Sequence, residues 1–204
     1  MKGLYLVTPD WDDTAALLQA TESALQGGAS LIQYRHKTAT EALRQVQAQA
    51  LLALCRRHNV PFIINDHVAL CQALDADGVH VGGTDASVAK VRALLGADKI
   101  VGASCYGDLP LAREAAGAGA SYVAFGGFYP SRVKKYVVST SPDIILQAKA
   151  VLTIPVCVIG GMTAANAQPL VAAGADLVAA ISSVYMTADA RIAAQAFAAL
   201  FAAP

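Results

Sequence analysis

Short runs of apolar residues alternate with longer amphipathic stretches along the whole chain. The runs are rich in Val, Ile, Leu and Tyr, and their continuous apolar character is typical of parallel strands buried on both faces. The stretches between them are rich in Ala and Leu at helical spacing. The pattern predicts eight strands, at Leu4–Val7, Ser30–Tyr34, Phe62–Ile64, Gly78–Val81, Ile100–Ser104, Tyr122–Phe125, Pro155–Ile159 and Leu177–Ile181.

A helix is predicted after each strand, which indicates a parallel α/β sheet. Eight such units without a Pro/Ser-rich linker predict one domain over residues 1–204, a single (β/α)8 TIM barrel. The alternative is an open doubly wound sheet, which commonly has fewer strands. The predicted helices span residues 13–26, 40–58, 67–74, 87–95, 109–118, 142–151, 163–173 and 188–201.

Composition restricts the classes of partner. Hydrophobic residues make up 55% of the chain and charged residues 15%, with a formal net charge of zero. This balance provides no basic surface for nucleic acid or an anionic membrane. No apolar run is long enough to span a bilayer, and the four cysteines are widely spaced without a CxxC pair. We therefore expect a cytoplasmic protein with reduced, buried thiols and small-molecule partners. The sequence is compatible with a homo-oligomer.

The carboxyl ends of the predicted strands carry the candidate chemistry, because active sites of (β/α)8 barrels lie there. The third strand ends abruptly in Asn65 and Asp66. A buried strand gains no stability from ending in a carboxylate, so this change of character favours a functional role. The strand ends together supply Gln33, Arg35, Lys37, Asn65, Asp66, Gly82, Gly83, Thr84, Asp85, Ser104, Ser131, Arg132, Lys134, Lys135, Gly160, Gly161, Ser182 and Ser183.

Arg35 and Lys37 predict an anion site after the second strand. Their i, i+2 spacing points both side chains to one side of an extended chain, where they repel unless an anion lies between them. The alternative is a solvated charged loop. A guanidinium offers a planar fork to phosphate oxygens and an ammonium offers a point charge, so the pair favours a phosphate ligand.

Asp66 and Asp85 predict a magnesium site beside these cations. They follow the third and fourth strands, which are neighbours in a barrel. Mg²⁺ prefers oxygen ligands and is often held by one or two carboxylates plus substrate phosphates. Taken alone, each aspartate could instead cap the helix that follows it. Their combination with Arg35 and Lys37 favours the metal.

The ends of strands seven and eight predict a second phosphate site. Gly160-Gly161 and Ser182-Ser183 stand where barrels frequently bind phosphate through backbone N–H groups. A Gly-Gly pair alone would be a tight turn, but both edges together favour a monophosphate. No Ser-His-Asp or Cys-His order stands out, so no nucleophile is assigned and the four histidines are given structural or supporting roles.

These strand ends, in this order, resemble the thiamine-phosphate synthase (thiamine-phosphate pyrophosphorylase) family. The resemblance runs from Leu4 to about Ser183. It implies a (β/α)8 barrel that joins hydroxymethylpyrimidine pyrophosphate to thiazole ethyl phosphate, giving thiamine phosphate and pyrophosphate. The segments that carry it are Gln33-Tyr34-Arg35-His36-Lys37; Ile64-Asn65-Asp66 with Asp77-Gly78-Val79-His80-Val81-Gly82 and Asp85; Ala124-Phe125-Gly126-Gly127-Phe128-Tyr129-Pro130-Ser131 with Lys134; and Val158-Ile159-Gly160-Gly161-Met162 with Asn166.

The resemblance also implies a role for each matched residue. Arg35, Lys37 and Lys134 would be catalytic, and Asp66 and Asp85 would bind Mg²⁺. In this family the thiazole nitrogen is itself the nucleophile, which agrees with the missing triad. The implied substrate contacts are Gln33, Arg35, Lys37 and Asn65 to the pyrimidine pyrophosphate, Ser104 to the pyrimidine, Lys134 to the leaving pyrophosphate, Ser131 to the thiazole, and Gly161, Ile181 and Ser182 to the thiazole phosphate.

Two positions depart from the family pattern. Val133 stands in place of a threonine, and Gly83 in place of a glutamine. Each lost hydrogen bond is worth about 0.5–1.5 kcal/mol, which would weaken activity without abolishing it. The alternatives are a thiazole tautomerase-like isomerase, or a non-catalytic barrel that binds thiamine phosphate or its precursors. The isomerase would need no pyrophosphate site, so the cations and aspartates favour the transferase.

Overall fold

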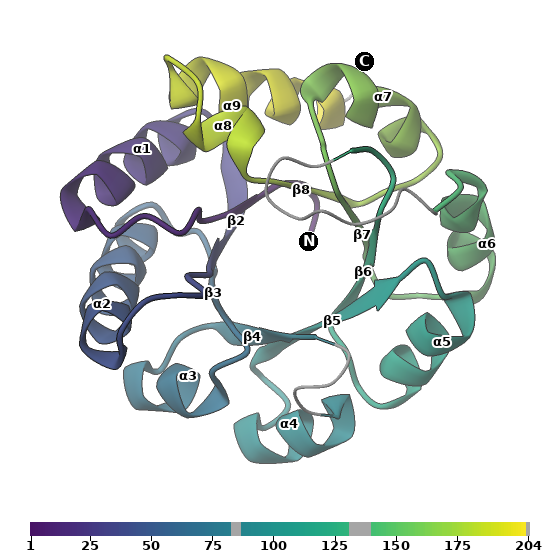
Figure 1. The fold of residues 1–204 in the computed structure, drawn as a ribbon. Coiled ribbons are helices and arrows are strands. Elements are labelled where there is room, and N and C mark those ends of the chain that lie inside the picture. The colour runs from purple at the N-terminus through teal and green to yellow at the C-terminus, as the bar shows by residue number, and fades with distance from the viewer. Residues whose placement is uncertain (83–86, 131–139, 203–204) are drawn as a thin grey trace.

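A computed structural model describes residues 1–82, 87–130 and 140–202. Its eight parallel strands form a closed barrel in sequence order, and β1 is hydrogen-bonded to both β2 and β8 (Figure 1). The barrel prediction is therefore confirmed, and the open doubly wound sheet is excluded. The strands are β1 Gly3–Val7, β2 Ala29–Tyr34, β3 Phe62–Asn65, β4 Gly78–Val81, β5 Ile100–Tyr106, β6 Tyr122–Gly126, β7 Val156–Ile159 and β8 Leu177–Ala180.

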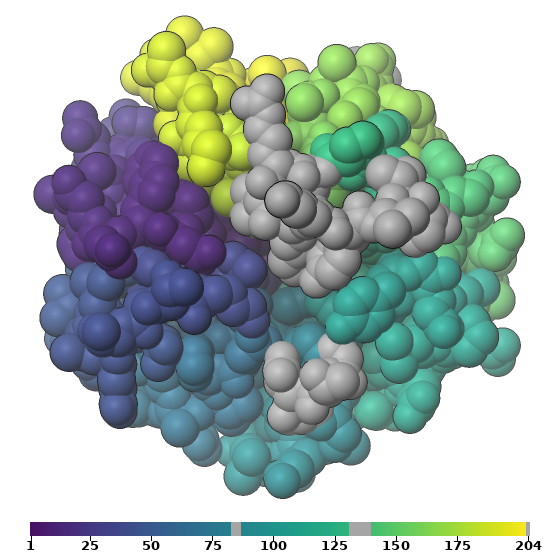
Figure 2. Space-filling view, in the orientation of Figure 1, coloured from purple at the N-terminus to yellow at the C-terminus, as the bar shows by residue number. Residues whose placement is uncertain are grey.

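The helices form a ring around the barrel, as Figure 1 shows, and the space-filling view from the same side shows the chain following this ring in sequence order (Figure 2). All eight predicted helices are present, and a short helix between β8 and the last helix was not predicted. Within the described residues, none of the helices is long and apolar enough to cross a membrane. The helices are α1 Thr14–Gln26, α2 Glu41–Arg57, α3 Val68–Leu74, α4 Val88–Leu95, α5 Leu109–Gly117, α6 Asp143–Val151, α7 Ala164–Ala172, α8 Ser182–Tyr185, α9 Ala190–Ala198 and the 3-10 helix η1 Ala199–Phe201.

Alternation along the strands divides the core into two parts. Successive side chains of a strand point to opposite faces, so one set fills the barrel and the other packs under the helices. The larger part lies between strands and helices and includes Ile32 and Tyr34. The smaller part, called here the interior cluster, consists of Tyr5, Val7, Leu31, Ile63, Tyr122, Ala124, Cys157, Leu177, Ala179 and Ile181.

The four cysteines are free and buried, as predicted. Burial raises the pKa of Cys71 to about 11 and the pKa of Cys55 and Cys105 to about 12. These thiols therefore stay protonated near neutral pH, where a thiolate would be needed for reactivity. Their role is packing.

Gly102 in β5 provides the space for an aromatic ring inside the barrel. A β-carbon at this position would lie 2.1 Å from Cζ of Tyr122 on β6. We expect Gly102→Ala to lower the free energy of unfolding by about 1–3 kcal/mol, because the buried ring cannot move aside. Urea denaturation checks this.

Gly117→Ala is the matched control, because no atom lies within 4 Å of a β-carbon built at Gly117. This helical position should gain up to about 1 kcal/mol, since alanine favours a helix over glycine. Equal effects of the two substitutions would contradict the packing argument.

Candidate active site

Asp66 directly follows β3 and has an unusual backbone conformation. Its φ is +62°, in the left-handed region, and its N–H donates to the carbonyl of His80 at 2.9 Å. The N-cap position of α3 is His67, and not Asp66. The helix-cap alternative for Asp66 is therefore wrong.

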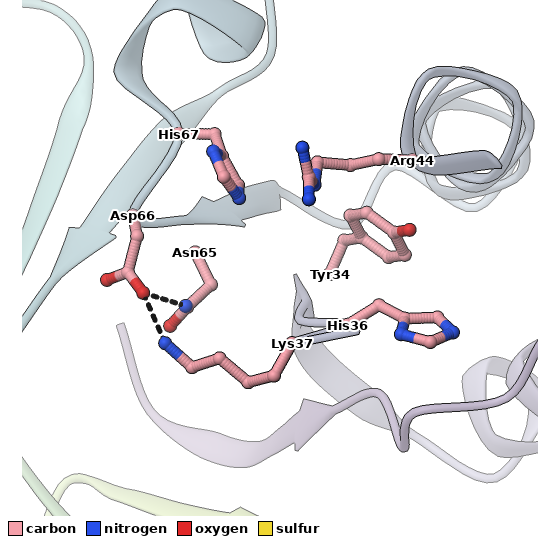
Figure 3. Close-up of a pocket in the computed structure, with 7 residues that line it drawn as sticks. All are labelled: Tyr34, His36, Lys37, Arg44, Asn65, Asp66 and His67. Carbon is pink, nitrogen blue, oxygen red and sulfur yellow. Dashed lines mark hydrogen bonds and ion pairs between the residues drawn. The ribbon is translucent and has the colours of Figure 1, made fainter. Parts of the chain in front are cut away.

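The carboxylate of Asp66 instead joins two other predicted site residues. Its Oδ2 accepts hydrogen bonds at 2.6 Å from the Nζ of Lys37 and at 2.6 Å from the Nδ2 of Asn65 (Figure 3). The side chain of Asp66 is 18% exposed, and that of Lys37 is 50% exposed. The ends of β2 and β3 thus bring a cation, an amide and a carboxylate together at one edge of the barrel.

A cavity of about 280 Å³ lies beside this group. Figure 3 shows the side chains of Arg44 and His67 pointing toward one another across it. Sequence reasoning missed Arg44, although its place in the first turns of the helix after the cationic segment was a signal. The cavity is lined by Tyr34, His36, Lys37, Arg44, Asn65, Asp66 and His67.

The segment that carries Arg35 and Lys37 is held by the loop after β1. The N–H of Arg35 donates to Oγ1 of Thr8 at 2.8 Å, and its Nη1 donates to Oδ1 of Asp10 at 3.2 Å. The same Oδ1 accepts from the N–H of Lys37 at 2.9 Å. Asp10 was not predicted as a site residue, yet it fixes the backbone of one predicted cation and the side chain of the other.

Gln33 and Ser104 face the barrel interior from β2 and β5. Gln33 is 4% exposed and its Nε2 donates to the hydroxyl of Tyr5. The Oγ of Ser104 lies 2.9 Å from Nε2 of His80. The register between β5 and β6 shifts between Ser104 and Tyr106, and such bulges often re-aim side chains next to active sites. Both residues stand near the carboxyl ends of their strands, as predicted.

The ends of β7 and β8 carry the residues predicted for the second phosphate site. Gly160 and Gly161 have φ values of +116° and +62°. Ile181 is the N-cap residue of α8, and Ser182 is its first residue. The buried Oγ of Ser183 has no hydrogen-bond partner within the described part of the chain. The unpredicted helix α8 therefore begins where the second phosphate site was expected.

A family model described as thiamine monophosphate synthase matches residues 4–184 of this barrel. The chain belongs to the thiamine monophosphate synthase family. The match confirms the resemblance carried by the strand ends, and with it the prediction of a transferase of thiamine biosynthesis.

Individual members of the thiamine monophosphate synthase family match over nearly their full length. The thiamine-phosphate synthase of Janthinobacterium sp. is 67% identical over 202 residues, covering 99% of this chain and 98% of the relative. That of Methylobacillus flagellatus is 50% identical, covering 98% and 96%. The solved thiamine phosphate pyrophosphorylase of Pyrococcus furiosus superposes with a TM-score of 0.84 at 29% identity, covering 97% and 94%.

Several residues that the sequence singles out lie outside the described residues. The helix after the fourth strand is nevertheless informative, because Oγ of Ser87 accepts from the N–H of Lys90 at 3.3 Å and caps α4. A cap by an earlier aspartate is therefore not needed there. The candidate residues outside the described ranges are Gly83, Thr84, Asp85, Ser131, Arg132, Val133, Lys134 and Lys135.

The side chains around Asp66 suit Mg²⁺, which is bound partly by water and substrate, better than an ion that side chains alone would have to hold. Across residues 1–82, 87–130 and 140–202, no three His, Cys, Asp or Glu side chains gather in a way that could hold an ion. Mg²⁺ keeps several waters and takes one or two carboxylates plus substrate phosphates, so a single carboxylate beside cations fits it.

Proposed function

We propose that this member of the thiamine monophosphate synthase family transfers a hydroxymethylpyrimidine group from pyrophosphate to the nitrogen of thiazole ethyl phosphate, with Mg²⁺ as cofactor. The observation that carries the proposal is the convergence of Lys37, Asn65 and Asp66 at the ends of β2 and β3. A site of this composition suits a ligand with several phosphate charges and a divalent ion.

The reaction exchanges one bond for another. The bond between the pyrimidine methylene carbon and the pyrophosphate oxygen breaks, and pyrophosphate leaves with the electron pair. The lone pair of the thiazole nitrogen forms the new C–N bond, so no protein base or nucleophile is required. The task of the protein is to orient both substrates and to stabilise charge on the leaving group.

The cations at the ends of β2 and β6 would perform the second task. Arg35, Lys37 and Lys134 would hold the leaving oxygens, and Asp10 keeps Arg35 and Lys37 in place. Asp66 and Asp85 would hold Mg²⁺, which when bound neutralises charge on the pyrophosphate. Lys37 would then turn from Asp66 to a phosphate oxygen. Gln33, Asn65 and Ser104 would orient the pyrimidine pyrophosphate.

The thiazole phosphate would bind on the opposite side of the barrel mouth. Backbone N–H groups of Gly161, Ile181 and Ser182 would take the phosphate, and Ser131 would face the thiazole. The buried hydroxyl of Ser183 in α8, which has no partner among the described residues, supports a polar ligand there.

Gly161→Ala tests this phosphate site. A β-carbon there would lie 2.3 Å from the carbonyl oxygen of Pro130, so the loop against it must shift. We expect the KM for thiazole phosphate to rise about tenfold or more, with the KM for pyrimidine pyrophosphate nearly unchanged. Steady-state kinetics with each substrate varied in turn measures both.

Gly96→Ala is the matched control for Gly161→Ala. Gly96 also has a positive φ, +82°, but nothing lies within 4 Å of its added β-carbon. Both variants should lose about 1–3 kcal/mol of stability because alanine is strained at a positive φ, and Gly161→Ala should lose more because its β-carbon also meets the carbonyl of Pro130. A rise in KM in both variants, or in neither, would contradict the assignment of Gly161.

One incubation separates the proposed function from its alternatives. The purified protein is given both substrates with Mg²⁺, and thiamine phosphate and pyrophosphate are measured. The transferase forms both products and needs both substrates. An isomerase would alter the thiazole phosphate alone, and a non-catalytic barrel would bind thiamine phosphate without turnover. Either of these results would refute the proposal.

A further inference from the structure

A chain of hydrogen bonds crosses the barrel interior and joins Gln33 to Ser104. The Nε2 of Gln33 donates to the hydroxyl of Tyr5, and the phenol oxygens of Tyr5 and Tyr122 are 2.6 Å apart. The hydroxyl of Tyr122 lies 2.8 Å from Nδ1 of His80, whose Nε2 lies 2.9 Å from Oγ of Ser104. Each contact links a different pair of strands.

The three middle residues are fixed in place by packing. Tyr5 and Tyr122 belong to the interior cluster and are 1% and 0% exposed, and His80 is 7% exposed. The ring of Tyr122 meets Tyr5 edge-on and stacks on His80, with centroids 5.6 Å apart in both pairs. The missing side chain of Gly102 makes room for it. Buried polar groups are costly unless they are paired, so each group in this row of hydrogen bonds depends on its neighbours.

The chemistry of the groups fixes the direction in which each hydrogen bond is donated. Desolvation by burial raises the pKa of both phenols, so each tyrosine keeps one proton to donate. The amide N–H of Gln33 only donates, so the oxygen of Tyr5 accepts there and its proton goes to Tyr122. Tyr122 then donates to Nδ1 of His80, which leaves the proton on Nε2 to be donated to Ser104.

The two end residues of this row of hydrogen bonds, Gln33 and Ser104, therefore offer opposite groups to a ligand. Gln33 has its carbonyl oxygen available as an acceptor, since its Nε2 is engaged with Tyr5. Ser104 accepts from His80 and so has its hydroxyl proton available as a donor. Whether Ser104 on β5 can donate a hydrogen bond to a ligand thus depends on groups on four other strands.

We propose that Tyr5, Tyr122 and His80 are positioning residues that set this polarity and so select an aminopyrimidine ring. The inference rests on the proposed function, because it takes Gln33 and Ser104 as the residues that face the pyrimidine. An exocyclic amino group donates to the acceptor of Gln33, and a ring nitrogen accepts from Ser104. An oxopyrimidine inverts the pattern, because its carbonyl accepts and its ring N–H donates. It would leave buried polar groups facing like groups.

Tyr122→Phe tests the inference, because it removes the central hydroxyl and keeps the ring. The experiment compares kcat/KM for the aminopyrimidine pyrophosphate and for its 4-oxo counterpart, at saturating thiazole phosphate. The wild-type chain should prefer the amino ring on the order of 10⁴-fold. In the variant this preference should fall about tenfold or more, mainly through KM for the amino ring, while KM for thiazole phosphate stays unchanged.

Three further variants make the result decisive. Tyr5→Phe breaks the same chain, and the double variant should lose no more preference than either single one, since each already interrupts it. Tyr185→Phe is the control. It removes a buried hydroxyl 2.8 Å from Oγ1 of Thr21, outside the interior cluster, and should keep the full preference.

Each outcome decides one question. If Tyr122→Phe and Tyr5→Phe both keep the wild-type preference, the inference is overturned. If Tyr122→Phe does not fold, Tyr5→Phe alone decides in the same way. A loss of preference in Tyr185→Phe equal to that in Tyr122→Phe would also overturn the inference. A wild-type chain that turns over neither pyrimidine refutes the proposed function instead.

Discussion

Asp66→Asn should lower kcat/KM by about 10²-fold or more, with the fold intact. Asparagine tolerates the left-handed φ of +62° and keeps the size of the side chain, so the substitution removes the charge alone. The loss should fall mainly on kcat, because pyrophosphate gains negative charge as it leaves, and Mg²⁺ held by Asp66 would neutralise that charge. Steady-state kinetics at saturating Mg²⁺ measures it.

Asp75→Asn is a closely matched control for Asp66→Asn. Asp75 is also in the left-handed region, with φ of +52°, and its carboxylate accepts from Lys99 at 2.5 Å. That hydrogen bond is the largest cause of the lowered pKa of the Asp75 carboxyl. The pair lies at the amino ends of β4 and β5, away from the proposed chemistry. Full activity in Asp66→Asn, or an equal loss in Asp75→Asn, would contradict the metal assignment.

Lys37→Gln should lower kcat/KM by about 10- to 100-fold, because the leaving pyrophosphate loses one charge-assisted contact. The substitution should change the unfolding midpoint little, since the ion pair of Lys37 with Asp66 is half exposed on the lysine side. Rates with pyrimidine pyrophosphate varied at fixed Mg²⁺, together with thermal unfolding, check both statements.

Lys99→Gln controls for the loss of an aspartate-paired lysine. Lys99 pairs with Asp75 in the same chemistry at the other end of the barrel, and its side chain is 28% exposed. This variant should retain wild-type rates. The role given to Lys37 would be refuted by normal turnover in Lys37→Gln under limiting substrate.

The fold was predictable because the strand signal is strong. A strand enclosed by helices must be apolar on both faces, and Phe62-Ile63-Ile64 shows this without interruption. The same enclosure explains why Asn65 and Asp66 stood out, since a polar residue at the end of such a run has few structural reasons to be there. The site at β2 and β3 therefore emerged from the sequence, and the structure brings Lys37, Asn65 and Asp66 together.

The supporting contacts were not predictable for physical reasons. Asp10 reaches Arg35 and Lys37 across more than twenty positions of sequence, so no local spacing reveals it. Tyr5 and Tyr122 look like ordinary core aromatics, because their hydroxyl groups meet only in the closed barrel. The one-turn helix α8 is too short to show a helical period. Sequence patterns thus located the strand ends but not the contacts between distant strands.

The central claim is that Asp66 anchors a divalent ion that serves a departing pyrophosphate. Electron paramagnetic resonance of Mn²⁺, used in place of Mg²⁺, tests it directly when the ion is titrated into the protein with inorganic pyrophosphate present. We expect bound Mn²⁺ in the wild-type chain and in Asp75→Asn, and binding at least about tenfold weaker in Asp66→Asn. Equal Mn²⁺ binding by all three proteins would contradict the claim.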